Sequence, residues 1–148
     1  MFTAVGGVLA AALLFATVSR VMSDNGSTSS RGGTGALEFD VGLASQRAPA
    51  VERSGPLLFP DPQNRGRDIF VQHLGGSDWV AFEARASGAP RQCALRWEQD
   101  ARHFVDPCDG RVYAPDGAGL VSFPTKVNDK GHVVVDLAKP IPPLSTQG

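Results

Sequence analysis

The sequence predicts an all-β globular head that follows one N-terminal apolar segment. The chain has 17 glycines and 11 prolines among 148 residues, a content typical of chains that turn often. Short runs in which apolar and polar residues alternate are separated by these turn residues, which indicates strands. No stretch after residue 22 shows helical periodicity, so we expect no helix in the head. The expected form is a set of small antiparallel sheets in a barrel-like arrangement.

The N-terminal segment, residues 2–19, reads FTAVGGVLAAALLFATVS and carries no charge. As a helix it would span about 27 Å, close to the roughly 30 Å hydrocarbon core of a bilayer. A cleaved signal peptide is the alternative, but such a peptide usually begins with a basic region, which this segment lacks. We therefore expect residues 1–22 to be an uncleaved transmembrane anchor that contacts the lipid bilayer through residues 2–19.

The next segment, residues 23–35, reads SDNGSTSSRGGTG and is too polar to bury a core. A flexible linker of this kind would hold a domain roughly 20 Å from the membrane. Residues 36–148 then form the expected head.

The strands expected in the head are residues 36–43, 57–59, 68–73, 78–84, 95–97, 102–105, 111–113, 124–127 and 132–137. Gly75 and Gly76 lie between the third and fourth of these and predict a hairpin. Residues 44–67 are rich in Pro, Gly and Arg and are expected to be mostly loop. Within them, residues 61–68 are expected to be a solvated loop, with an interaction loop as the alternative. The tail at 139–143 contains three prolines, so it cannot be a central strand.

Charge and motifs exclude several functional classes. The 14 basic and 15 acidic residues nearly cancel, and without a basic stripe we expect no nucleic-acid partner. The chain has no nucleophile elbow, no phosphate-binding glycine loop before a helix and no zincin motif, so we expect no enzyme. Its two cysteines, Cys93 and Cys108, are too few for a four-thiolate cluster but can form one disulfide. His73 and His132 are expected at the surface.

Two segments around the cysteines carry a resemblance to a known family. Residues 88–97 read GAPRQCALRW and residues 106–113 read DPCDGRVY. They resemble the two cluster-binding loops of the Rieske iron–sulfur family, most of all the iron–sulfur subunit of cytochrome bc complexes. The family's loops read C-x-H-x-G-C, followed within four residues by Trp, and C-P-C-H-G, followed by Ser, one residue and an aromatic. The framework positions match at Cys93, Trp97, Pro107, Cys108, Gly110 and Tyr113.

The resemblance implies a disulfide between Cys93 and Cys108. It also places the four cluster-ligand positions on Gly88, Pro90, Asp106 and Asp109, none of which is Cys or His. A Rieske cluster needs two thiolates and two imidazoles, and carboxylates are hard donors that replace them poorly. The family's serine that hydrogen-bonds the cluster is Arg111 here, and only residues 116–120 stand where the family has its proline-rich cover. We therefore expect no cofactor and no metal.

The function implied is that of a non-redox structural or accessory subunit of a membrane electron-transfer complex, cytochrome bc-type or a related respiratory or photosynthetic one. Its head would dock on partner membrane subunits. A disulfide needs an oxidising compartment, so we expect a single-pass cell-membrane protein with an extracytoplasmic head, periplasmic or lumenal. One alternative is a membrane-tethered redox or metal-binding module that uses the Cys93 and Cys108 pair, or His103 with Asp106 and Asp109. Another is a free-standing membrane-tethered binding domain.

Overall fold

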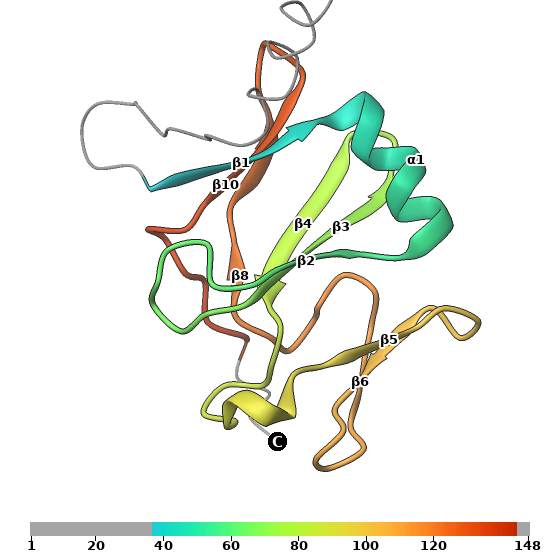
Figure 1. Cartoon of the computed structure of the whole chain (residues 1–148), viewed down its shortest axis with the longest axis vertical. Helices are drawn as coiled ribbons and strands as arrows, with labels where there is room; N and C mark the ends of the chain where they lie inside the picture. Colours follow the sequence, from blue (N-terminus) through green and yellow to red (C-terminus); the bar gives the residue numbers. More distant parts are fainter. Residues whose placement is uncertain (1–36, 145–148) are drawn as a thin grey trace, which may run out of the picture.

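The structure, a computed structural model, describes residues 37–144 (Figure 1). The expected anchor at 1–22 and the expected linker at 23–35 lie outside the described residues. Within residues 37–144, no helix is long and apolar enough to cross a membrane. The elements in chain order are β1 (Glu38–Leu43), α1 (Ala44–Ser54), β2 (Leu57–Phe59), β3 (Ile69–Gly75), β4 (Asp78–Glu83), the 3-10 helix η1 (Arg91–Cys93), β5 (Arg96–Glu98), β6 (His103–Val105), β7 (Val112–Tyr113), β8 (Ser122–Phe123), β9 (Thr125–Val127) and β10 (His132–Asp136).

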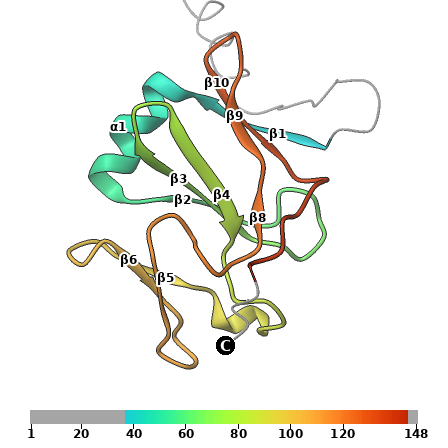
Figure 2. The same cartoon turned by 180° about the vertical axis from the view of Figure 1, so that it is seen from behind.

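The strands form three antiparallel sheets, as the sequence predicts. Their orders are β1-β10-β9, β2-β3-β4-β8 and β5-β6-β7. The first two sheets and α1 make one end of the head, while β5 and β6 lie at the other end, a division seen from both sides in Figures 1 and 2. Every expected strand is present, displaced by at most two residues at its ends, and only the short strand β8 was not expected.

The expectation that residues 44–67 lack a helix is wrong, because residues 44–54 form α1 even though Pro49 lies inside it. Ala44, Ala48 and Val51 recur at helical spacing and pack against the core, with Val51 buried. Tertiary packing thus outweighs the hydrogen bond lost at proline, which usually breaks a helix. Gly55 ends α1 with φ of +87°, and its N–H donates to Val51 O at 2.8 Å.

The hairpin of β3 and β4 separates two hydrophobic cores. One face contributes Ile69, Val71, Trp79 and Ala81 to a base core shared with α1, β1 and β10. Alternate residues point the other way, because successive side chains of a strand face opposite sides. That second face belongs to an aromatic core made of Phe70, Phe82, Ala84, Leu95, Phe104, Tyr113 and Leu120. A hairpin buried on both faces ties the base to the part of the head that carries the two cysteines.

Candidate functional site

The disulfide predicted between Cys93 and Cys108 is present, with the two Cα atoms 5.5 Å apart. Cys93 ends η1 and is buried, whereas Cys108 is exposed in the turn between β6 and β7. The bond joins a first loop, residues 86–95, to a second loop, residues 106–111. The sequence has two cysteines in all, so no free thiol is left.

Asp106 stabilises the turn of the second loop through three hydrogen bonds. Only 3% of its surface is exposed, and its carboxylate oxygen Oδ1 accepts the N–H of Cys108 at 2.8 Å. Its own N–H donates to Arg111 O at 2.8 Å, and its carbonyl accepts the N–H of Gly110 at 2.9 Å. Asp106 therefore fixes the turn that presents Cys108.

Asp109 also belongs to the second loop, and its exposed carboxylate contacts Arg111. Its Oδ1 accepts the N–H of Arg111 at 2.8 Å, and its Oδ2 lies 3.8 Å from the Arg111 guanidinium. A side-chain hydrogen bond with Tyr113 is the largest cause that raises the pKa of Arg111, followed by the Coulombic effects of Tyr113 and Asp109. Arg111 is therefore a cation at neutral pH, at the position where the resemblance implies a serine. Because both charges are exposed, the pair contributes little to stability.

Gly88 and Pro90 are the two positions in the first loop where the resemblance implies cluster ligands. Gly88 has a φ of +74°, and a Cβ built there would meet nothing within 4 Å. Pro90 is exposed, and its carbonyl accepts the N–H of Cys93 at 3.0 Å, which opens η1. Neither residue offers a ligand side chain.

These residues do not fit a Rieske iron–sulfur cluster. Among residues 37–144, one group of potential ligand atoms gathers within 4.8 Å, and it consists of Cys93, Asp106 and Cys108. Both sulfurs of that group are in the disulfide, so neither is a thiolate. His103 is not part of it: this residue lies on β6 opposite Glu98, and the structure does not bring it together with Asp106 and Asp109 as a metal-ligand set.

The expectation that His73 lies at the surface is wrong, since only 5% of its side chain is exposed. β3 is covered on this face by α1, so the ring lies between Trp79, at a centroid distance of 4.7 Å, and Glu52 of α1. Nε2 is 3.0 Å from Gly76 O, while Nδ1 has no hydrogen-bond partner. His132 is half-buried, with Nδ1 2.8 Å from Asp40 Oδ2.

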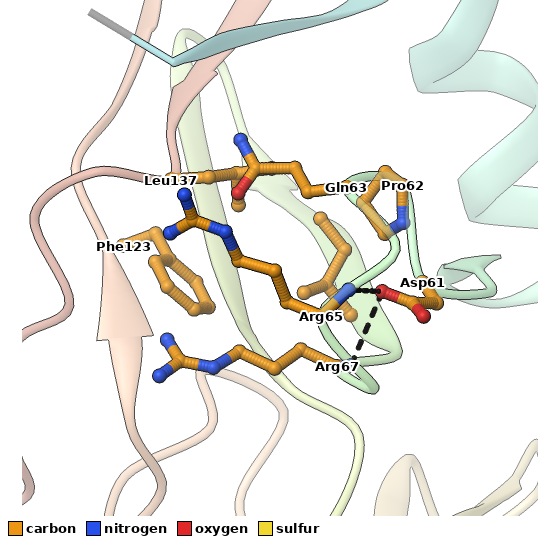
Figure 3. A pocket seen from close by; sticks show the side chains of 8 residues that line it. Asp61, Pro62, Gln63, Arg65, Arg67, Phe123 and Leu137 are labelled. Atoms are coloured by element: carbon orange, nitrogen blue, oxygen red, sulfur yellow. Dashed lines mark hydrogen bonds between the residues drawn. The ribbon is translucent and has the colours of Figure 1, made fainter.

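A small pocket lies between β8 and the loop at residues 61–68, which we expected to be solvated (Figure 3). Its lining consists of Asp61, Pro62, Gln63, Arg65, Arg67, Ile69, Phe123 and Leu137. The carboxylate of Asp61 accepts the backbone N–H groups of Arg65 and Gly66 at 2.6 and 2.8 Å, and that of Arg67 at 3.4 Å. The signal available in the sequence was an aspartate a few residues before an Arg-Gly-Arg run, which alone does not distinguish a pocket from an exposed turn.

Comparison with known proteins supports the fold. No protein-family model matches the chain, and no curated protein does. Among solved structures, the chain is similar to the crystal structure of the cyanobacterial plasma membrane Rieske protein PetC3 from Synechocystis PCC 6803, with a TM-score of 0.50 and 20% identity. The match covers 66% of this chain and 98% of that one. A likeness at this identity concerns architecture alone. The head therefore has a Rieske-like fold of antiparallel sheets with one short helix.

Proposed function

We propose that this chain is a non-redox structural subunit of a membrane electron-transfer complex, cytochrome bc-type or related. One observation carries the proposal: the fold keeps the disulfide between its two loops, while Gly88, Pro90, Asp106 and Asp109 occupy the ligand positions implied by the family. With both cysteines bonded to each other, the chain has no thiolate for a cluster. What remains of such a subunit is its anchor and its head.

Contacts among this chain's own residues hold the two loops in place. The disulfide links them, the Asp106 turn holds the second loop, and β5 to β7 pack on the aromatic core. The surface they present, here called the loop surface, consists of the exposed residues Pro90, Pro107, Cys108 and Val112. The same loops also carry the exposed charged residues Arg91, Asp109 and Arg111, and docking interfaces combine apolar residues with a polar rim. We propose that the loop surface contacts a membrane subunit of the host complex.

The proposed location is the cell membrane, with the head on the extracytoplasmic side. A disulfide persists in an oxidising compartment, and residues 2–19 are long enough to cross a bilayer as a helix. The structural neighbour is itself described as a plasma membrane protein, which agrees with this placement.

Docking is tested by purifying the tagged full chain from mild-detergent membranes and identifying the proteins that accompany it. Val112 is 57% exposed on β7, so Val112→Lys should remove most of the associated subunits. Leu58 is 50% exposed on β2, away from the loop surface, and Leu58→Lys is the matched control. If the two variants retain the same partners as the wild type, the loop surface is not the contact. If no partner accompanies the wild type, the chain is a free-standing tethered domain.

The absence of redox chemistry is tested separately by metal analysis. The purified protein should be colourless and contain no stoichiometric iron or acid-labile sulfide. A Rieske-type electron paramagnetic resonance signal after reduction would overturn the proposal, because it would require ligands that the loops do not offer.

A second candidate function is a metal site that opens when the disulfide is reduced. It is favoured by the group of Cys93, Asp106 and Cys108, whose ligand atoms lie within 4.8 Å of one another. A dithiol reductant would supply two electrons and two protons to the disulfide and become oxidised to its own disulfide. The two cysteines, deprotonated on binding, and the carboxylate would then suit Zn²⁺. One equivalent of Zn²⁺ bound by reduced but not by oxidised protein, and lost in Asp106→Ala but not in Asp109→Ala, is the result that would favour it.

A further inference from the structure

His73 is a buried histidine with one ring nitrogen that has no hydrogen-bond partner. Only 5% of its side chain is exposed, and among the described residues Nδ1 is the one buried side-chain nitrogen or oxygen without such a partner. The other ring nitrogen, Nε2, lies 3.0 Å from the carbonyl oxygen of Gly76. A carbonyl oxygen only accepts hydrogen bonds, so Nε2 carries the proton in the neutral ring. Nδ1 then presents a lone pair rather than an N–H.

That lone pair faces a carboxylate across the contact between β3 and α1. Nδ1 of His73 lies 3.6 Å from Oε1 of Glu52, whose side chain is 65% exposed. Two acceptors that face each other cannot share a hydrogen bond, so the neutral ring gains no bond from Glu52. A proton on Nδ1 turns the same two groups into an ion pair. The exposed Glu52 side chain can then move in to the length of a charge-assisted hydrogen bond, about 2.7–2.9 Å.

Glu52 is the only carboxylate within 4.0 Å of the His73 ring among residues 37–144. β2 carries no charged residue, and the remaining charged residues of the other two elements that pack here are Arg47 and Arg53 of α1, and Asp78 and Glu83 of β4. The first donates to a backbone carbonyl and the last lies 3.6 Å from a guanidinium, while the other two are exposed. The charge at this contact therefore depends on Glu52 and His73.

Two further groups stabilise the protonated ring. The ring centroid of Trp79 lies 4.7 Å from that of His73, with an angle of 36° between the planes, and an indole face attracts a cation within about 6 Å. The hydrogen bond to the Gly76 carbonyl also becomes stronger, because an ionised donor forms a bond roughly twice as strong as a neutral one. Together with Glu52, these groups offset the cost of a charge in a buried position.

We propose that Glu52 and His73 form a latch between α1 and the β3–β4 hairpin, which closes when His73 is protonated. With a neutral ring, α1 is held on this hairpin by apolar packing. A proton taken from solvent at Nδ1 adds an ion pair across the same contact. The effect reaches the loops, because α1 ends at Gly55, which packs against Trp97 of β5. Mild acid should therefore hold α1 more firmly against the hairpin and against the sheet that carries the second loop.

The test measures how much Glu52 contributes to stability at two pH values. The purified full chain in nonionic detergent is unfolded with urea at about pH 5.5 and at about pH 8, on either side of the ordinary histidine titration near pH 6.5. The ion pair exists only in the folded, protonated state, so its contribution is present in acid and is lost as the pH rises. We expect Glu52→Gln to lower the folding equilibrium constant by about threefold to tenfold more at the lower pH.

Glu38→Gln is the matched control. Glu38 is also an exposed glutamate, and its carboxylate lies 3.4 Å from Lys126 Nζ. A lysine stays charged throughout this range, so the effect of Glu38→Gln should be the same at both pH values. In a His73→Gln background, the effect of Glu52→Gln should likewise lose its pH dependence. Equal effects of Glu52→Gln at both pH values in the wild type, or a pH dependence that persists without His73, overturn the latch.

A second measurement leaves His73 and Glu52 unchanged and reads the ring directly. The chain has three histidines, so ¹⁵N-histidine resonances of the folded protein are assigned with His103→Gln and His132→Gln. His73 should carry its proton on Nε2 at about pH 8 and protons on both nitrogens at about pH 5.5. A ring that stays neutral in acid, or that carries its proton on Nδ1 at the higher pH, overturns the proposal. Neither measurement involves partner subunits, so its failure is distinguishable from a failure of copurification, which tests the proposed function.

Discussion

Gly55 lies directly against the indole of Trp97: a Cβ atom at Gly55 would come within 2.5 Å of Trp97 Cδ1. The glycine ends α1 in the base of the head, whereas Trp97 is on β5 and packs on Phe104 at a centroid distance of 4.8 Å. The Trp97 Nε1–H also donates to Gln99 Oε1 at 2.7 Å, so the ring is held in place. The C-terminal end of α1 therefore packs closely against the sheet that carries the second loop.

We predict that Gly55→Ala destabilises the head by about 2–4 kcal/mol, because Gly55 combines a φ of +87° and a ψ of −175°, a region essentially restricted to glycine, with an overpacked contact. Gly66→Ala is the matched control, since Gly66 has a φ of +71° but nothing within 4 Å of its Cβ position. It should cost only about 1–2 kcal/mol. Urea unfolding of both variants measures the difference. Equal losses of stability would show that the Trp97 contact does not constrain this site.

Replacing both cysteines by serine should lower the free energy of unfolding by about 2–4 kcal/mol. The bond between Cys93 and Cys108 closes a loop with a sequence separation of 15, and its removal enlarges the conformational freedom of the unfolded chain. Changing both residues avoids a reactive single thiol. Equilibrium unfolding without reductant measures the loss. An unchanged urea midpoint, or two free thiols in unfolded unreduced wild type, would contradict this prediction.

Asp106→Ala should cost about 1–3 kcal/mol, because it leaves the Cys108 N–H without its acceptor in a mostly buried turn. Asp109→Ala is the comparison: this carboxylate is half-exposed and accepts an exposed N–H, so the cost should stay within about 0.5 kcal/mol. Thermal unfolding of the two variants measures both values. The same cost for both would mean that Asp106 does not organise the second loop.

Protonation of Asp61 should lower the free energy of unfolding of the head in acid. Burial raises the pKa of this carboxyl, but the N–H groups of Gly66, Arg65 and Arg67, with the charge of Arg91, more than offset it, so the pKa lies below its ordinary value of 3.8. A pKa lowered on folding contributes stability above the unfolded pKa, and this is lost as the pH falls through the folded pKa. Asp61→Asn should therefore flatten the loss of stability below about pH 4, measured by urea midpoints over that range. An unchanged acid dependence would contradict the assignment.

The strands were predictable because alternate residues along each strand face different cores in the structure. Ile69, Val71, Trp79 and Ala81 face one core, and their neighbours Phe70 and Phe82 face the other, a period of two that is legible in the sequence. The pairing of Cys93 with Cys108 came from the resemblance of the loops, since two cysteines alone only permit a disulfide.

The features missed by sequence reasoning depend on tertiary contacts. Helix α1 contains Pro49 and several polar residues, and its helical identity follows from Val51 and two alanines packing on β3 and β1. The burial of His73 results from the cover that α1 provides, which cannot be anticipated once the helix is missed. The pocket joins the 60–68 loop to Phe123 and Leu137, which are more than fifty residues away, and no local pattern connects them.

The placement of the β3–β4 hairpin between the base core and the aromatic core has a consequence for how the head melts. Alternate side chains of β3 and β4 belong to the base core and to the aromatic core. If one core lost its packing, the hairpin that also packs against the other core would be exposed. The two ends should consequently unfold together in one cooperative transition. Substitutions confined to the two loops should therefore lower the unfolding temperature or leave it unchanged, but keep a single transition.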